Sequence, residues 1–191
     1  MRIVAGKHRG RTLATPEGRD IRPTSERLRE AVFNILAHSV PSLPAEARVL
    51  DVFAGTGALG LEALSRGAAH VTFIETDKTA TRLIRYNLAT LGEAENANLL
   101  ARDAGQPGAA PAGAPADLAF LDPPYRSGLA EPALAALGAG GWLAEGARII
   151  IELAHDEDFT SPSGFVEDDR RTYGKSRVVF LTWGGLEGSQ P

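Results

Sequence analysis

The chain has 191 residues, of which 43% are hydrophobic, so it is long enough for one domain with a core of its own. It contains no cysteine, which excludes disulfides, cysteinyl zinc sites, iron–sulfur clusters and a thiol nucleophile. The four histidines lie far apart in the sequence, and we expect no metal site. No apolar run approaches the roughly 18 residues of a membrane span. The N-terminus also lacks the apolar part of a signal peptide, so we expect a soluble cytoplasmic protein.

Charge is distributed unevenly along the chain. The formal net charge of -4 argues against a protein that coats nucleic acid non-specifically. Residues 1–11 nevertheless carry four basic groups and no acid, and a second basic cluster lies within residues 170–177. Each cluster is either a solvated face or part of a nucleic-acid contact surface.

The N-terminal third predicts a hairpin followed by a helix. Residues 2–5 and 11–14 flank a turn-prone stretch with Gly6 and Gly10, which indicates a short β-hairpin. Ser25 is a plausible cap for a helix whose apolar residues recur on one face, and this helix should end before Pro41.

From residue 48 onward, short apolar strands alternate with helices. The strands are expected at 49–52, 71–74, 98–101, 118–121, 149–153 and 178–183, and the helices at 58–65, 78–91 and 129–137. Such alternation is typical of an α/β doubly wound fold, with a mostly parallel sheet covered on both faces. Residues 104–116, rich in Ala, Gly and Pro, are expected to form a flexible connection.

A glycine-rich loop follows the first of these strands. Gly55, Gly57 and Gly60 match a dinucleotide fingerprint, and Glu75 lies at the end of the next strand, where a carboxylate would bind ribose hydroxyls. Asp51 would repel a pyrophosphate but suits a cationic sulfonium, which favours S-adenosylmethionine over NAD. No lysine follows the glycines, so a phosphate-binding P-loop is excluded.

The sequence Asp122-Pro123-Pro124-Tyr125 follows the fourth predicted strand, at the same sheet edge as the glycine loop. The prolines hold this loop rigid. The Asp122 carboxylate and the Pro123 carbonyl would accept the two N–H bonds of a planar amine, and its lone pair would be freed to attack a methyl group. Tyr125 would stack on the ring that carries the amine.

Several acceptors remain open at this point. Guanine N2, adenine N6 of DNA or RNA, and the side-chain amide of a protein glutamine all present a planar NH2 group. Methylation of pyrimidine C5 is disfavoured, because it commonly needs a thiolate. A dehydrogenase that uses NAD would leave Asp51 and the Asp122 to Tyr125 loop without a role. Besides a methyltransferase and a dehydrogenase, the third class of function is a binding module that keeps the fold but has no activity.

With these motifs in view, the sequence resembles class I S-adenosylmethionine-dependent methyltransferases. Within them it is similar to the RsmD family, which methylates the exocyclic N2 of a guanine in 16S ribosomal RNA. The resemblance is carried by residues 1–11, 22–27 and 33–36 together with the two loops. It implies a Rossmann-like, mostly parallel seven-stranded sheet (residues 21–191) with a basic N-terminal hairpin extension (residues 1–20). Family members usually carry a short apolar helix where residues 104–116 lie.

The resemblance also implies binding partners and roles for individual residues. The expected partners are S-adenosylmethionine, whose product is S-adenosylhomocysteine, and 16S ribosomal RNA within the small ribosomal subunit, bound by a monomer. The implied catalytic residues are Asp122, Pro123, Pro124 and Tyr125. The implied cofactor-binding residues are Asp51, Ala54, Gly55, Thr56, Gly57, Glu75, Asp103 and Ala104, and Arg22, Thr24 and Ser25 would cover the bound cofactor. The implied RNA-binding residues are Lys7, Arg9 and Arg11.

Overall fold

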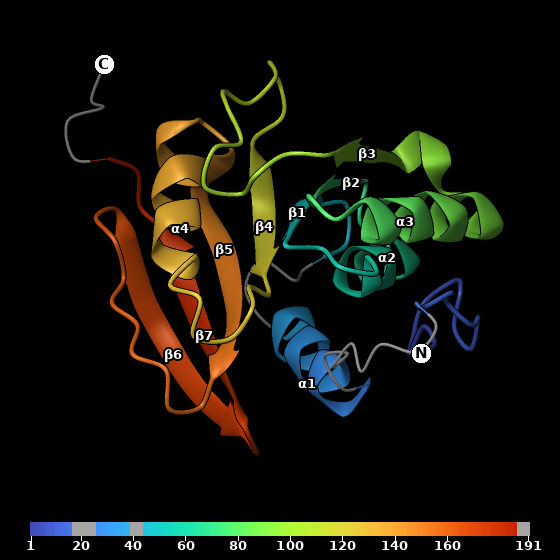
Figure 1. Ribbon diagram of the computed structural model, residues 1–191, viewed down its shortest axis with the longest axis horizontal. Helices are drawn as coiled ribbons and strands as arrows, with labels where there is room; N and C mark the ends of the chain where they lie inside the picture. Colours follow the sequence, from blue (N-terminus) through green and yellow to red (C-terminus); the bar gives the residue numbers. More distant parts are fainter. Residues whose placement is uncertain (17–25, 39–43, 187–191) are drawn as a thin grey trace.

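A seven-stranded sheet forms the centre of the computed structural model, which describes residues 1–16, 26–38 and 44–186 (Figure 1). The strand order is β3-β2-β1-β4-β5-β7-β6. The strands are β1 (Arg48–Val52), β2 (His70–Ile74), β3 (Ala97–Leu100), β4 (Ala116–Leu121), β5 (Leu143–Ala154), β6 (Phe165–Tyr173) and β7 (Ser176–Trp183). The helices are α1 (Glu26–Ala37), α2 (Ala58–Ser65), α3 (Lys78–Leu91) and α4 (Ala130–Ala139), with a 3-10 turn η1 (Ala94–Asn96).

The direction of the strands confirms the predicted class of sheet. Strands β3, β2, β1, β4 and β5 pair in parallel, whereas β7 is antiparallel to both β5 and β6. The chain runs outward from β1 through β2 to β3 and then returns to place β4 on the other side of β1. The order therefore reverses between β1 and β4, and in open α/β sheets ligands bind at the carboxyl ends of the strands at such a reversal.

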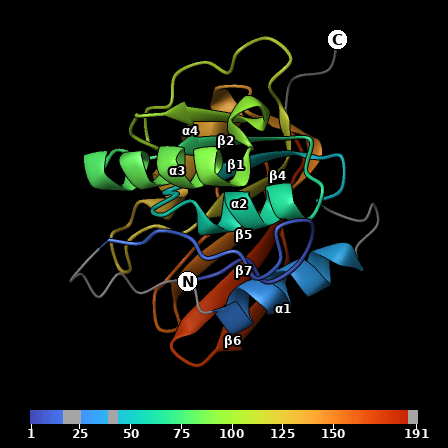
Figure 2. The same ribbon diagram turned by 90° about the vertical axis from the view of Figure 1, so that its right-hand side faces the viewer.

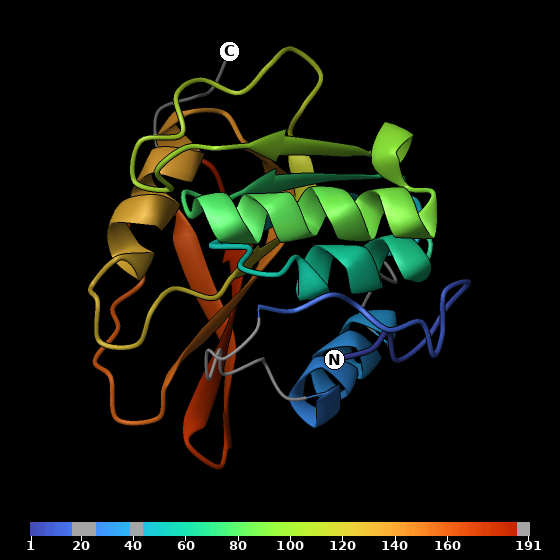
Figure 3. The same ribbon diagram turned by 45° about the vertical axis from the view of Figure 1, so that its right-hand side comes forward.

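Helices cover both faces of the sheet, as Figures 2 and 3 show. Helices α1, α2 and α3 pack on one face in a core with Val49 of β1 and Phe120 of β4. Helix α4 packs on the other face in a second core with Leu50 and Val52. Among the described residues, no helix is long and apolar enough to cross a membrane.

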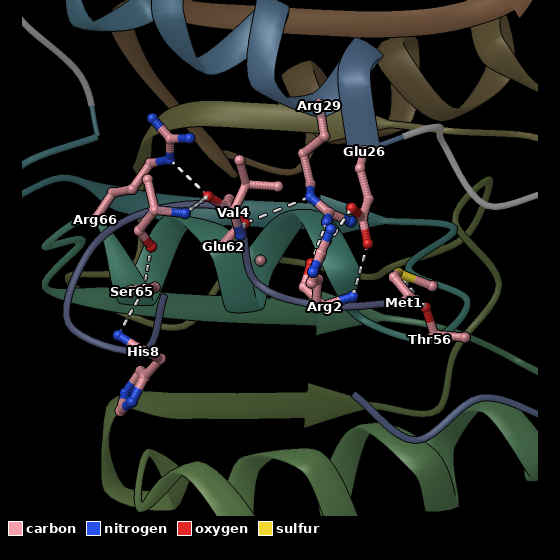
Figure 4. A network of polar contacts seen from close by, with 12 residues as sticks. Met1, Arg2, Val4, His8, Glu26, Arg29, Thr56, Glu62, Ser65 and Arg66 are labelled. Carbon is pink, nitrogen blue, oxygen red and sulfur yellow. Dashed lines mark hydrogen bonds and ion pairs between the residues drawn. The ribbon is translucent and has the colours of Figure 1, made fainter. Parts of the chain in front are cut away.

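The N-terminal segment pairs with itself and lies against α2 (Figures 2 and 4). Arg2 forms an antiparallel bridge with Thr12, so the predicted hairpin is present. Ile3 and Leu13 are buried in the core beneath α1 and α2. Gly6 approaches α2 so closely that a Cβ there would lie 1.8 Å from the Ser65 carbonyl oxygen. The hairpin is thus part of the packed structure.

A buried carboxylate holds the hairpin in place (Figure 4). Glu62 of α2 is fully buried and accepts the backbone N–H groups of Val4 and Ala5 at 2.8 and 3.0 Å. It also accepts from Nε of Arg66 at 2.8 Å and lies 3.4 Å from Nε of Arg29, which comes from α1. One side chain of α2 therefore joins the hairpin to the first helix.

Two predictions about elements need correction. Strand β6 is absent from the predicted strands, because only Phe165 at its start is buried and its central residues are charged and exposed. Residues 104–116 contain no helix, but they are not a free connection: Trp142 Nε1 donates to the Gly108 carbonyl at 2.8 Å and the Ala110 N–H to the Gly140 carbonyl at 2.9 Å. The predicted cap Ser25 and the helix limit Pro41 lie outside the described residues.

Candidate active site

A cavity of about 540 Å³ opens at the carboxyl ends of β1, β2 and β4, where the strand order reverses. Its size is within the roughly 300–1,000 Å³ of small-molecule sites. Both predicted loops contribute to it, as does the end of β5. The lining residues are Phe53, Gly55, Ile74, Glu75, Thr76, Arg102, Asp103, Ala104, Asp122, Pro123, Pro124, Tyr125, Leu129 and Glu152.

The glycine loop is shaped by left-handed backbone and close packing. Gly55 and Gly57 have φ of 54° and 77°, which glycine adopts without steric cost. A Cβ on Gly60 would lie 2.4 Å from the ring of Phe73, so this glycine lets α2 approach β2. Phe53 also has a positive φ, 57°, which costs an ordinary residue roughly 1–2 kcal/mol. Its strained backbone holds an aromatic ring in the cavity wall.

Glu75 ties the glycine loop to the end of β2. Its carboxylate accepts the backbone N–H of Gly55 at 2.8 Å, and those of Thr76 and Asp77 at 2.7 and 2.8 Å. The same side chain lines the cavity. Its binding of ribose hydroxyls stays a prediction.

Asp51 lies beneath the loop. Its side chain points toward α2, where Oδ2 accepts the Gly60 N–H at 2.8 Å, and the residue is only 1% exposed. Burial raises the pKa of Asp51 well above its usual value, and the nearby carboxylates of Asp122 and Glu75 raise it further. Both burial and the neighbouring acids therefore disfavour the charged form of Asp51.

Four of the implied cofactor-binding residues shape the loop without lining the cavity that the described residues form. Asp51, Ala54, Thr56 and Gly57 are all outside its wall. The Thr56 carbonyl accepts from Asn87 Nδ2 at 3.4 Å, and Asn87 also accepts the Ala14 N–H at 2.8 Å. The glycine loop is thus connected to the end of the N-terminal hairpin.

The remaining implied cofactor residues lie at the other end of the cavity or outside the described part of the chain. Asp103 and Ala104 follow β3 and line the cavity. Oδ1 of Asp103 accepts the Gly105 N–H at 2.7 Å, which fixes a tight turn. Arg22, Thr24 and Ser25 lie outside the described residues.

The Asp122 to Tyr125 loop begins directly after β4, and all four of its residues line the cavity. The Asp122 N–H donates to the Val52 carbonyl at 3.3 Å, so the loop starts beside the end of β1. The Tyr125 hydroxyl donates to Oε1 of Glu152 at 2.8 Å and lies 2.9 Å from Oγ of Ser176. Loop, cavity and glycine turn are therefore parts of one site.

Sequence reasoning missed Glu152 and Ser176. A signal for Glu152 was present, because it interrupts the apolar run of residues 149–153 at the carboxyl end of a parallel strand. Ser176 comes near it only through the antiparallel pairing of β5 with β7, which the sequence does not reveal.

The predicted RNA-binding residues lie on the hairpin, outside the cavity wall. Nζ of Lys7 is 2.7 Å from Oε1 of the buried Glu93, and Nη2 of Arg11 donates to the Thr90 carbonyl at 3.1 Å. Arg9 is exposed and lines a surface groove with Arg2. These cations differ in how far their charge is already paired.

The second basic cluster lies on the β6–β7 hairpin, and two of its four cations are paired with acids. Arg170 binds Glu167 through two hydrogen bonds of 2.8 and 2.7 Å, and Arg171 binds Asp169 at 2.7 Å.

Comparison with known proteins identifies the family. A family model described as conserved hypothetical protein 95 matches residues 1–182. A protein of Escherichia coli strain K12 named ribosomal RNA small subunit methyltransferase D is 45% identical over 152 residues, which cover 80% of this chain and 74% of that protein. The chain belongs to the RsmD family. A second RsmD relative with that name, from Haemophilus influenzae, is 37% identical over 176 residues, which cover 91% of this chain and 89% of that one.

Solved structures agree with the RsmD assignment. A putative methyltransferase from Escherichia coli superimposes with a TM-score of 0.82 and 38% identity, covering 97% of this chain and 99% of that one. A putative methylase from Haemophilus influenzae superimposes with a TM-score of 0.77 and 34% identity, covering 97% of this chain and 98% of that one. The chain therefore has the fold of class I methyltransferases and belongs to a methyltransferase family.

Proposed function

We propose that this protein transfers a methyl group from S-adenosylmethionine to the exocyclic N2 of a guanine in 16S ribosomal RNA of the small subunit. The proposal rests on one observation. The Asp122 to Tyr125 loop lines the same cavity as Gly55 of the glycine loop and Glu75 at the end of β2. The names of the RsmD relatives support ribosomal RNA as the substrate class. The protein would act in the cytoplasm as a monomer.

The chemistry of the cavity suits this donor. Its wall carries the carboxylates of Glu75, Asp103, Asp122 and Glu152, with Arg102 as a counter-charge. A negative site attracts a ligand with sulfonium and ammonium groups and repels the pyrophosphate of NAD. When bound, S-adenosylmethionine supplies an electrophilic methyl group and leaves as S-adenosylhomocysteine.

The chain's own residues would hold the donor at three places. Glu75 would accept from the ribose hydroxyls, and Asp103, next to Ala104, would accept from the adenine amine. Gly55 offers close backbone approach. Asp51, Ala54, Thr56 and Gly57 would act by keeping the glycine turn in shape, and Arg22, Thr24 and Ser25 would cover the donor.

The catalytic loop would prepare the acceptor nitrogen. Asp122 and the Pro123 carbonyl accept its two N–H bonds, which favours a tetrahedral nitrogen with a free lone pair. Pro124 limits the backbone of the loop, and the Tyr125 ring stacks on the base. As the nitrogen gains the methyl group and becomes cationic, Asp122 takes up a proton from it.

The hairpin within residues 1–20 would contact the RNA backbone through Lys7, Arg9 and Arg11, while residues 21–191 perform the transfer. Phosphate contacts position a substrate but carry no sequence information. The choice of guanine must therefore be made in the cavity.

The test is transfer of label from S-adenosylmethionine labelled in its methyl group. The acceptors are undermethylated small subunits, free 16S RNA, DNA and protein, each incubated with the purified full chain. We expect label in the RNA of the small subunit. Label in protein or DNA alone would contradict the proposal while leaving the methyltransferase fold in place.

A further inference from the structure

Glu152 occupies a position beside the catalytic loop that the proposed transfer does not yet use. Leu121 of β4 pairs with Ile151 of β5, so Asp122, just after β4, and Glu152, within β5, are the next residues on two neighbouring strands. Glu152 is 9% exposed and lines the cavity. Its carboxylate is therefore within the site, at the edge opposite the glycine loop.

Glu152, Ser176 and Tyr125 form a closed triangle of polar contacts. Tyr125 Oη and Ser176 Oγ both donate to Oε1 of Glu152, at 2.8 and 2.9 Å, and the two hydroxyls are 2.9 Å apart. Glu152 pairs with Val178, two residues after Ser176. The two side chains therefore share one face of the sheet as diagonal neighbours. Tyr125 therefore connects the Asp122 to Tyr125 loop to β5 and β7 through these polar contacts.

The triangle restrains a part of the loop that the prolines leave free. Pro123 and Pro124 limit the backbone, but the ring of Tyr125 can still turn about its two side-chain torsions. Hydrogen bonds to a charged acceptor are about twice as strong as neutral ones. The hydroxyl lies on the axis about which the ring turns, so this anchor fixes the direction of the Tyr125 side chain and the position of its ring in the cavity wall.

We propose that Glu152 and Ser176 are positioning residues that hold the Tyr125 ring as a rigid wall against the target base. They act through Tyr125 and do not touch the base themselves. The inference rests on the proposed function only for the identity of the planar group that stacks on the ring. A displaced base loses the alignment of its amine with the methyl group, and misplacement by about 1 Å can cost up to about 10²-fold in rate.

A double-mutant cycle tests the proposal with the full-length protein and its RNA substrate. Tyr125→Phe removes the hydroxyl, Glu152→Ala removes the acceptor, and the double variant removes both. We expect each single variant to lower kcat more than it raises the KM for RNA, by roughly 3- to 10-fold overall, with the affinity for S-adenosylmethionine unchanged. The double variant should be no slower than the slower single variant, within about twofold.

Three further variants sharpen the result. Glu152→Gln keeps the size of the side chain and one oxygen acceptor but removes the charge, so its rate should lie between those of the unaltered protein and Glu152→Ala. Ser176→Ala removes one corner of the triangle and repeats the cycle if Glu152→Ala does not fold. Glu145→Gln, the same change at an exposed position of β5, should leave kcat and KM unchanged.

Two kinetic outcomes would overturn the proposal. Multiplicative losses in the double variant would mean that Glu152 contacts the substrate directly. Unchanged kinetics in Tyr125→Phe would mean that the anchor has no role. The ring can also be followed without turnover, by NMR of labelled tyrosine: we expect faster Tyr125 ring motion in Glu152→Ala. An unchanged ring would contradict the proposal even if the acceptor is not guanine.

Discussion

At the scale of single residues, the proposed transfer depends most on Asp122. It lies in the cavity wall at the end of β4, while the glycine loop is built mainly by other residues. Asp122→Ala should therefore slow methyl transfer by roughly 10²–10⁴-fold and change the affinity for S-adenosylmethionine by less than about twofold. Single-turnover transfer and calorimetric binding measure the two quantities separately. An unchanged transfer rate would remove Asp122 from the mechanism.

Asp51 predicts a dependence of stability on pH. Burial raises its pKa in the folded protein, so the unfolded chain releases this proton at lower pH than the folded one. The contribution of Asp51 to the free energy of unfolding is full below about pH 4 and is lost as the pH rises toward the folded pKa. Asp51→Asn keeps an acceptor for the Gly60 N–H, so it should stabilise the protein at pH 7, and the gain should shrink toward pH 4. Urea unfolding at several pH values checks this, and a gain independent of pH would contradict it.

All of the predicted catalytic residues line the cavity, but only some of the predicted cofactor-binding residues do. Asp122 to Tyr125 line the cavity because they follow a buried strand directly. Asp51 does not line it, because side chains alternate along β1: its neighbours Leu50 and Val52 face α4, so Asp51 faces α2.

At the scale of elements, the junction of hairpin, α1 and α2 depends on one buried acid. Glu62→Ala would leave the buried guanidinium of Arg29 without its charge partner and free two hairpin N–H groups. We expect a loss of roughly 3–5 kcal/mol in the free energy of unfolding, measured with urea. Glu95→Ala, at an exposed acid of η1, should change it by less than about 0.5 kcal/mol. Equal effects of the two variants would contradict this account of the junction.

The cations of the hairpin should contribute unequally to RNA binding. Lys7 is already paired with Glu93, whereas in the described part of the chain no ion pair engages Arg9. Arg9→Ala should therefore weaken RNA binding and reduce its salt dependence more than Lys7→Ala does. Titrations at several salt concentrations measure both. If neither variant changes affinity or slope, the RNA contact lies elsewhere on the molecule.

Elements with a buried face were predictable, and those without one were not. Strands β1, β2 and β4 and helix α3 match their predicted ranges closely, since their apolar residues repeat with the period of the structure. Strand β5 begins at Leu143, before the predicted range of 149–153. Strand β6 carries charges on exposed positions at the sheet edge, so its pattern indicates no strand. Residues 104–116 lack apolar bulk, and their order comes from contacts with residues 140 and 142, far along the chain.

At the scale of the whole molecule, the fold brings all the functional loops to one edge of the sheet. A ligand that binds this edge of the folded state stabilises the entire domain by mass action. At a concentration of 100 times its Kd, S-adenosylmethionine should add about 2.7 kcal/mol to the free energy of unfolding and raise Tm by roughly 5–10 °C. NAD at equal concentration should cause no comparable shift. A shift with NAD alone would favour the dehydrogenase alternative.

The account as a whole depends on which atom receives the methyl group. The most direct measurement is nucleoside analysis of 16S RNA from small subunits that were methylated by this protein with labelled S-adenosylmethionine. The account predicts label in N2-methylguanosine, incorporated at least about 100-fold more slowly with Asp122→Ala and at an unchanged rate with Glu145→Gln. Label in N6-methyladenosine would contradict the guanine assignment, and absence of label from the RNA would contradict the central claim.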